Sequence, residues 1–161
     1  MEAYDGHYVG MIKFAQGKLF LHLRKLFPGI DEKWFIEAFM KSEVRAMLDM
    51  AVAKYVGMSN VEWARELFYE LGPGNPSEGI FIECEYKKGD EWDSLVACWC
   101  GYIYAYYQWK YNISSRELIE ILPLSVMERI YEPLHQMGWD AAVDKIHDEV
   151  LEQFGVKSPL R

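Results

Sequence analysis

The sequence predicts a mainly α-helical protein, a single compact helical bundle of about seven helices with one short β-strand or hairpin. Apolar residues recur every three or four positions along most of the chain, which is the spacing of one helix face. Three Ser-x-x-Glu sequences precede such stretches and are typical of helix starts. With 161 residues the chain can bury one hydrophobic core, so we expect one domain over 1–161.

Start and stop signals divide the N-terminal half into four predicted helices. Serine and aspartate side chains accept hydrogen bonds from the free N–H groups of a first turn, whereas proline or glycine commonly follows a last turn. Asp31, Ser42 and Ser59 are such starts, and Pro28-Gly29 and Gly57 are such ends. The predicted helices cover residues 8–27, 31–39, 44–55 and 60–71.

A linker rich in glycine and proline, residues 72–79, follows these helices. Apolar residues alternate over 80–86, which predicts the single β-strand, and residues 87–90 are typical of a turn. Because one strand is not stable alone, we expect it to pair with an extended segment near the N-terminus or with a partner chain. The linker also allows a subdivision into two helical halves, 1–71 and 80–155.

The second half begins with an apolar segment, residues 91–111, which we predict to be a buried central helix because it is apolar nearly all round. Its charge-free run is shorter than the ~20 residues that a membrane span needs, so no membrane segment is expected. Three shorter helices follow it. They begin at Ser114, at Ser125 with Pro133 as an expected kink, and at the capping residue Asp140, and they cover 114–122, 125–137 and 140–154.

The net charge and the number of cysteines limit which cellular compartment and which class of partner can be expected. The chain has 17 Lys and Arg against 25 Asp and Glu, and this net charge of −8 disfavours binding to nucleic acid phosphates. An acidic surface suits a basic protein partner, and it also suits simple solubility. The odd number of cysteines and the absence of a secretory leader predict reduced thiols in the cytoplasm. We interpret Cys84, Cys98 and Cys100 as small buried apolar residues.

Aromatic side chains in the second half predict a surface that binds another protein. Tyr and Trp provide large contact areas at low entropic cost, and nearby carboxylates would steer a basic partner. The alternative is that the same rings fill the core of the bundle. The predicted partner-binding residues are Trp92, Tyr104, Tyr107 and Trp109, with Glu83, Glu85 and Asp90 around them.

Two carboxylate-x-x-His sequences indicate an alternative function, a metal-dependent helical-bundle enzyme. Residues three apart share a helix face, and Glu-x-x-His units on neighbouring helices hold two iron ions in some four-helix bundles. The competing interpretation is that these histidines are capped or solvated. The candidate metal ligands are Glu132, His135, Asp144 and His147.

Motifs that are specific for one reaction are missing from the chain. It contains no glycine-rich phosphate loop, no Gly-x-Ser-x-Gly nucleophile elbow and no zincin sequence. Residues 113–131 have the spacing of a helix–turn–helix, but the predicted second helix carries only Arg129 as a basic residue near its start, which disfavours DNA binding. We therefore expect a non-enzymatic interaction protein with no cofactor and no catalytic residue.

The C-terminal third resembles a known family. The residues that carry the likeness are Lys110 to Glu117, Tyr131, Leu134-His135, Gly138 and Ala142 to Ile146. They are similar to a small bacterial domain of unknown function that is encoded beside ADP-ribosyltransferase-like toxin genes. The resemblance implies a bacterial, cytoplasmic, antitoxin-like or accessory component whose partner is a protein such as a toxin. A homodimer is also compatible with the sequence.

Overall fold

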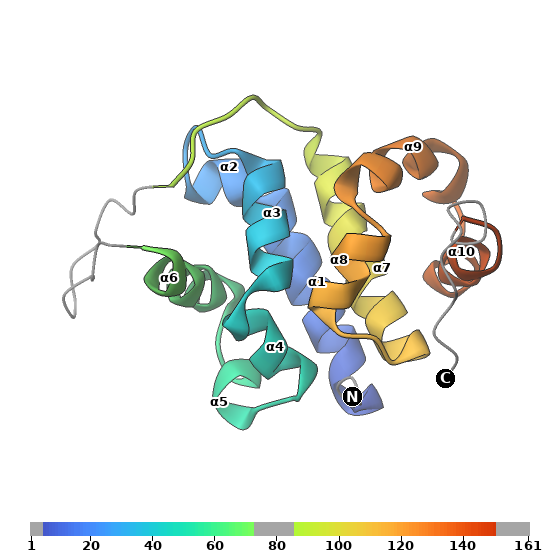
Figure 1. Ribbon diagram of the computed structural model, residues 1–161, viewed down its shortest axis with the longest axis horizontal. Coiled ribbons are helices and arrows are strands. Elements are labelled where there is room, and N and C mark those ends of the chain that lie inside the picture. The colour runs from blue at the N-terminus through green and yellow to red at the C-terminus, as the bar shows by residue number, and fades with distance from the viewer. Residues whose placement is uncertain (1–4, 73–85, 151–161) are drawn as a thin grey trace.

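Two long helices, α1 (Gly6–Leu21) and α7 (Ser94–Tyr111), lie at the centre of the molecule (Figure 1). The computed structural model describes residues 5–72 and 86–150, and these residues are mainly helical, as predicted. The other elements are α2 (Leu23–Leu26), α3 (Glu32–Lys41), α4 (Glu43–Asp49), α5 (Ala53–Val56), α6 (Asn60–Leu71), α8 (Ser115–Ile121), α9 (Leu124–Leu134), α10 (Trp139–Lys145) and a π-helical turn, Ile146–Val150. In Figure 1, α6 lies at one side of the central pair, and α9 and α10 lie at the other.

The described residues form ten α-helices rather than about seven: the eight ranges predicted above each contain a helix, and two of those predicted helices are divided. The predicted helix over 8–27 is interrupted at His22, where φ is −103° and ψ is 9°, and it resumes as α2. The predicted helix over 44–55 is interrupted after α4, where Ala51 has a φ of 51°. A left-handed residue cannot continue a right-handed helix, so α5 is a separate element.

Four predicted helix starts are confirmed. Asp31 and Ser42 each accept a hydrogen bond from the backbone N–H three residues later, at 3.0 and 3.1 Å. Ser59 and Ser114 form complete capping boxes, in which the following glutamate also accepts from the backbone N–H of the capping serine. Local sequence therefore determines where α3, α4, α6 and α8 begin.

The other two predicted starts are wrong. Ser125 lies inside α9, because the helix begins directly after Pro123, whose restricted φ and missing N–H suit a helix start. Asp140 lies in the first turn of α10, where its carboxylate accepts from Lys110 instead of capping the backbone. Pro133 occupies the last turn of α9 and not its middle, since the helix ends one residue later.

The two central helices are antiparallel and cross at a pair of glycines. A Cβ atom on Gly101 would lie 2.7 Å from the Cα atom of Gly17, and a Cβ atom on Gly17 would overlap the ring of Tyr102. The side-chain amide of Gln16 donates to the carbonyl of Gly101 at 2.8 Å at the same crossing. Only residues without a side chain allow the two backbones to approach so closely.

The core extends from this crossing through both halves of the chain. Phe35 stacks on Phe39 with ring centroids 6.1 Å apart, and Phe39 packs edge-on against Phe20 at 5.9 Å. Tyr104 and Tyr107 of α7 are fully buried, which agrees with a buried central helix but not with the partner-binding role predicted for these two residues. Among the described residues, none of the helices combines the length and apolarity that a membrane span requires.

The extended segment before α7 pairs with the loop between α2 and α3. Residues 80–85 of the predicted strand lie outside the described residues, and no strand forms in the parts that are described. An isolated antiparallel bridge joins Ile30 to Lys88, and the N–H of Asp31 donates to the carbonyl of Lys87 at 2.8 Å. The segment predicted as a turn, 87–90, thus lies beside the N-terminal half.

Candidate functional site

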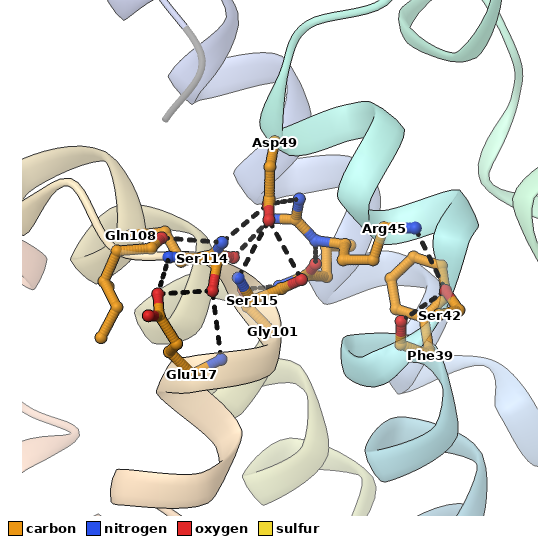
Figure 2. Close-up of polar contacts among 11 residues, drawn as sticks. Phe39, Ser42, Arg45, Asp49, Gly101, Gln108, Ser114, Ser115 and Glu117 are labelled. Atoms are coloured by element: carbon orange, nitrogen blue, oxygen red, sulfur yellow. Dashed lines mark hydrogen bonds and ion pairs between the residues drawn. The ribbon is translucent and has the colours of Figure 1, made fainter. Parts of the chain in front are cut away.

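A buried polar network joins four helices at the centre of the molecule (Figure 2). Arg45 of α4 donates to Asp49 at 2.7 Å, one turn along the same helix. The same guanidinium donates to Gln16 of α1 at 2.8 Å and to Gln108 of α7 at 2.7 Å. One side chain therefore links α4 to both central helices.

Asp49 accepts hydrogen bonds on both of its carboxylate oxygens. Besides Arg45, the amide of Gln108 donates to Oδ1 at 2.7 Å. The backbone N–H and the hydroxyl of Ser115, at the start of α8, donate to Oδ2 at 3.0 and 3.2 Å (Figure 2). A buried carboxylate with this many donors is satisfied in its charged form.

This network is a structural element rather than a catalytic one. The side chain of Arg45 is 0% exposed and that of Asp49 is 1% exposed, so solvent and substrates do not reach them. The network was not predicted from the sequence, although Arg45 and Asp49 are four residues apart and Asp49 directly follows the core residue Leu48. A charged pair in an apolar helix stripe is the signal that could have revealed it.

A cluster of rings on the outside of the bundle is the candidate functional site. Phe14, Tyr102 and Trp139 form a triangle in which the ring centroids are 5.5 to 5.6 Å apart and each pair meets edge to face. These three residues come from α1, α7 and α10. We define the aromatic face as Met11 and Phe14 of α1, Tyr102, Tyr106 and Trp109 of α7, and Trp139 of α10.

The aromatic face is accessible to solvent. Phe14 is 44% exposed and Met11, one turn away on the same side of α1, is 42% exposed. Tyr102, Tyr106, Trp109 and Trp139 are half-buried and stand on the elements beside it. Single exposed apolar residues are ordinary, but two exposed ones on α1 that adjoin half-buried rings of α7 and α10 are typical of a binding surface.

A lysine lies beneath these rings. Lys13 is only 7% exposed, and its ammonium lies 3.5 Å from the ring centroid of Trp139, 4.8 Å from that of Phe14 and 5.6 Å from that of Tyr106. Burial lowers the pKa of Lys13 below its usual value, because the charged form loses hydration. The rings stabilise the ammonium through cation–π contacts.

Carboxylates border the aromatic face on α10. Lys110 of α7 donates to Asp140 at 2.7 Å and forms an ion pair with Asp144 at 2.6 Å. The hydrogen bond from Lys110 lowers the pKa of each carboxyl group, so both are ionised at neutral pH. The hydroxyls of Tyr106 and Tyr111 donate to the same two carboxylates, at 2.8 and 2.7 Å.

Two of the predicted partner-binding residues belong to the core. Tyr104 is fully buried and donates to the carbonyl of Leu122 at 2.7 Å. Tyr107 is also fully buried, and its hydroxyl forms a 2.9 Å hydrogen bond with Nδ1 of His147. These tyrosines are therefore inaccessible to a partner in this structure, and the interpretation of aromatic residues as core applies to them.

The remaining predicted residues that the structure describes do not gather into one surface. Trp109 is half-buried at the C-terminal end of α7, within the aromatic face. Trp92 is buried and precedes α7, where its carbonyl accepts from Arg24 at 2.6 Å, and exposed Asp90 lies near it in the chain. The length of α7 separates the two ends by roughly 25 Å. Glu83 and Glu85 lie outside the described residues.

The first carboxylate–histidine pair is occupied by local contacts. Nδ1 of His135 lies 2.9 Å from the carbonyl of Tyr131 and 3.0 Å from that of Glu132. The imidazole stacks on the ring of Tyr131, with centroids 4.4 Å apart. The histidine is thus held at the end of α9 by its own helix, in keeping with the capped interpretation.

The second pair is also bound to neighbouring side chains. Asp144 accepts from Lys110 and Tyr111, and the ring of His147 stacks on Tyr111 with centroids 3.6 Å apart. Within residues 5–72 and 86–150, no three His, Cys, Asp or Glu side chains are placed to share a metal ion. The structure therefore does not bring Glu132, His135, Asp144 and His147 together as one ligand set.

The two described cysteines are free thiols on α7. Burial raises the pKa of Cys98, and it raises the pKa of Cys100 well above its usual value. A catalytic cysteine needs the opposite shift, because the thiolate is the nucleophile. Cys100 is fully buried, as the sequence indicated, whereas Cys98 is partly exposed, and Cys84 lies outside the described residues.

Comparisons with known proteins found no match to a family model, to a curated protein or to a solved structure. Evidence for function therefore comes from the geometry of this chain. The aromatic face is accessible and chemically distinctive, whereas the central polar network is closed to solvent.

Proposed function

We propose that this chain is a non-enzymatic protein-interaction module that binds a protein partner through the aromatic face. The observation that carries the proposal is the exposure of Phe14, which packs against the rings of Tyr102 and Trp139, and of Met11 one turn away on α1. Aromatic residues and methionine are enriched at protein interfaces, where a few of them provide most of the binding energy. Burial of these side chains by a partner removes their apolar surface from water.

A basic partner fits the charge around this surface. Asp140 and Asp144 lie on α10 next to the aromatic face, and the whole chain has a net charge of −8. Negative charge at the border of an interface accelerates association with a basic protein. The resemblance of the C-terminal third to an antitoxin-like component suggests a toxin as that partner.

The experiment is co-expression of the full chain with the protein encoded by the adjacent gene, followed by size-exclusion chromatography with light scattering. A stable complex supports the proposal. The variant Phe14→Asp should bind at least about tenfold more weakly, because it places a charge in the apolar contact. Circular dichroism of the free variant checks that it remains folded.

The matched control is Leu71→Asp. Leu71 is 47% exposed, similar to Phe14, but it lies at the end of α6, away from α10 (Figure 1). This variant should bind as well as the unmodified chain. Equal binding by Phe14→Asp would show that the aromatic face is not the interface, and a chain that remains alone would argue against this partner.

A further inference from the structure

We infer that Lys13 is the receptor for a carboxylate that a protein partner inserts among the rings of the aromatic face. The inference rests on the proposed function and specifies the chemistry of the contact. The partner segment carries Asp or Glu beside an apolar residue, so that the carboxylate meets Lys13 and the apolar residue meets Phe14 and Met11.

The ammonium of Lys13 has no anionic partner within the described part of the chain. Every other buried charged side chain there has one or more polar partners: Arg45 and Asp49 bind each other, and Glu32 binds Arg24 at 2.7 Å. Around Lys13 the ammonium contacts aromatic rings, and no hydrogen bond or ion pair joins it to any residue within 5–72 and 86–150. This is the opposite of the usual environment of a buried charge.

Ring faces satisfy only part of what an ammonium requires. A lysine ammonium has three N–H donors, and each forms its strongest hydrogen bond with an ionised acceptor. Cation–π contacts offset some of the lost hydration but provide no lone pairs in the direction of the N–H bonds. A carboxylate that arrived from outside would therefore supply the acceptors that the site lacks.

The neighbouring acidic residue Asp140 does not form an ion pair with Lys13. Asp140 directly follows Trp139, yet its carboxylate accepts from Lys110 at 2.7 Å and from Tyr106 at 2.8 Å. Lys110 carries one positive charge against the two carboxylates of Asp140 and Asp144, which reduces their repulsion of an incoming carboxylate without cancelling it. The ammonium lies 4.8 Å from the ring centroid of Phe14, which is 44% exposed. The proposed route for the carboxylate is past this exposed ring, which can change rotamer.

The experiment compares two blocked dipeptides on the full-length chain by NMR, with the Trp139 indole N–H and the Lys13 side-chain carbon beside the ammonium as reporters. The probes are N-acetyl-Phe-Glu-amide and its neutral isostere, N-acetyl-Phe-Gln-amide. The glutamate peptide should bind about tenfold more tightly at low salt, since a charge-assisted hydrogen bond is stronger than a neutral one. Added salt should reduce this difference.

The matched variants are Lys13→Met and Lys13→Arg. Methionine keeps the apolar stem, so that variant should fold and bind both peptides equally, whereas arginine keeps the charge and should retain the preference for glutamate. Equal binding of both peptides to the unmodified chain would overturn the inference but leave the apolar interface intact. Shifts from neither peptide, or a glutamate preference that persists in Lys13→Met, would also overturn it, while the co-expression assay tests the interface independently.

Discussion

Arg45 and Lys13 are both buried cations, yet their surroundings differ in kind. Arg45 donates to Asp49, Gln16 and Gln108 at 2.7 to 2.8 Å. Lys13 contacts rings that themselves reach the surface. Because a buried charge costs much more free energy without polar partners than with them, the first cation belongs to the structure of the bundle and the second is the one that we propose for binding.

Removal of the carboxylate in the polar network should destabilise the fold strongly. Asp49→Ala leaves the fully buried guanidinium of Arg45 without its ion-pair partner, which should reduce the free energy of unfolding by about 3–5 kcal/mol. Urea denaturation measures the change. Glu37→Ala is the control, because it breaks an exposed pair with Lys41 of the same i,i+4 spacing and should cost about 0.5 kcal/mol or less. A similar loss in both variants would contradict the structural role.

His147 should make stability depend on pH. Burial lowers the pKa of His147 in the folded protein, against the partial opposing influence of Asp148 and Asp144. Between the folded and unfolded pKa values the unfolded chain therefore binds more protons. This stability is fully present above about pH 6.5 and is lost as the pH falls through the lowered value.

The measurement for His147 is the melting temperature between pH 8 and pH 5. The unmodified chain should melt at a lower temperature as the pH falls below about 6.5, and His147→Gln should show a flatter dependence. The glutamine variant also loses the stacking on Tyr111 and so melts lower throughout, but the slope and not the absolute value carries the test. Parallel curves for both proteins would contradict the assignment.

At the scale of the elements, the signals near helix starts were more reliable than the lengths of the helices. Asp31, Ser42, Ser59 and Ser114 begin helices as predicted, because a cap acts within one turn. The division at Ala51 was missed, since alanine favours helices and its left-handed backbone is set by packing. The packing of α1 on α7 likewise depends on glycines that are far apart in the sequence.

The glycine crossing of α1 and α7 should not tolerate a methyl group. Gly101→Ala would place Cβ 2.7 Å from the Cα atom of Gly17, which is backbone and has no other rotamer to adopt. We expect a loss of about 1–3 kcal/mol, measured by urea denaturation. Gly10→Ala, also on α1, meets nothing within 4 Å and should be neutral or stabilising by up to about 1 kcal/mol. Equal effects of the two variants would contradict the close crossing.

At the scale of the whole molecule, tertiary packing determines which aromatic rings are accessible to solvent. The sequence of α7 is rich in Tyr and Trp. Because the helix is apolar nearly all round, its hydrophobic pattern does not indicate which side faces solvent. The structure buries Tyr104 and Tyr107, and it places Trp109 in the aromatic face with Phe14 and Trp139, neither of which was predicted. The proposed interaction surface therefore combines helices from both ends of the chain.

Local chemistry in the sequence determined the helical class, four of the helix starts and the burial of α7, because periodicity and capping act over a few residues. Tertiary structure alone decided that Arg45 donates to acceptors on α1 and α7 and that Lys13, among the described residues, contacts aromatic rings without an anionic partner. It also decided that the two carboxylate–histidine pairs do not meet. Such contacts join residues distant in sequence, and the close packing of helix faces, rather than any local pattern, selects them.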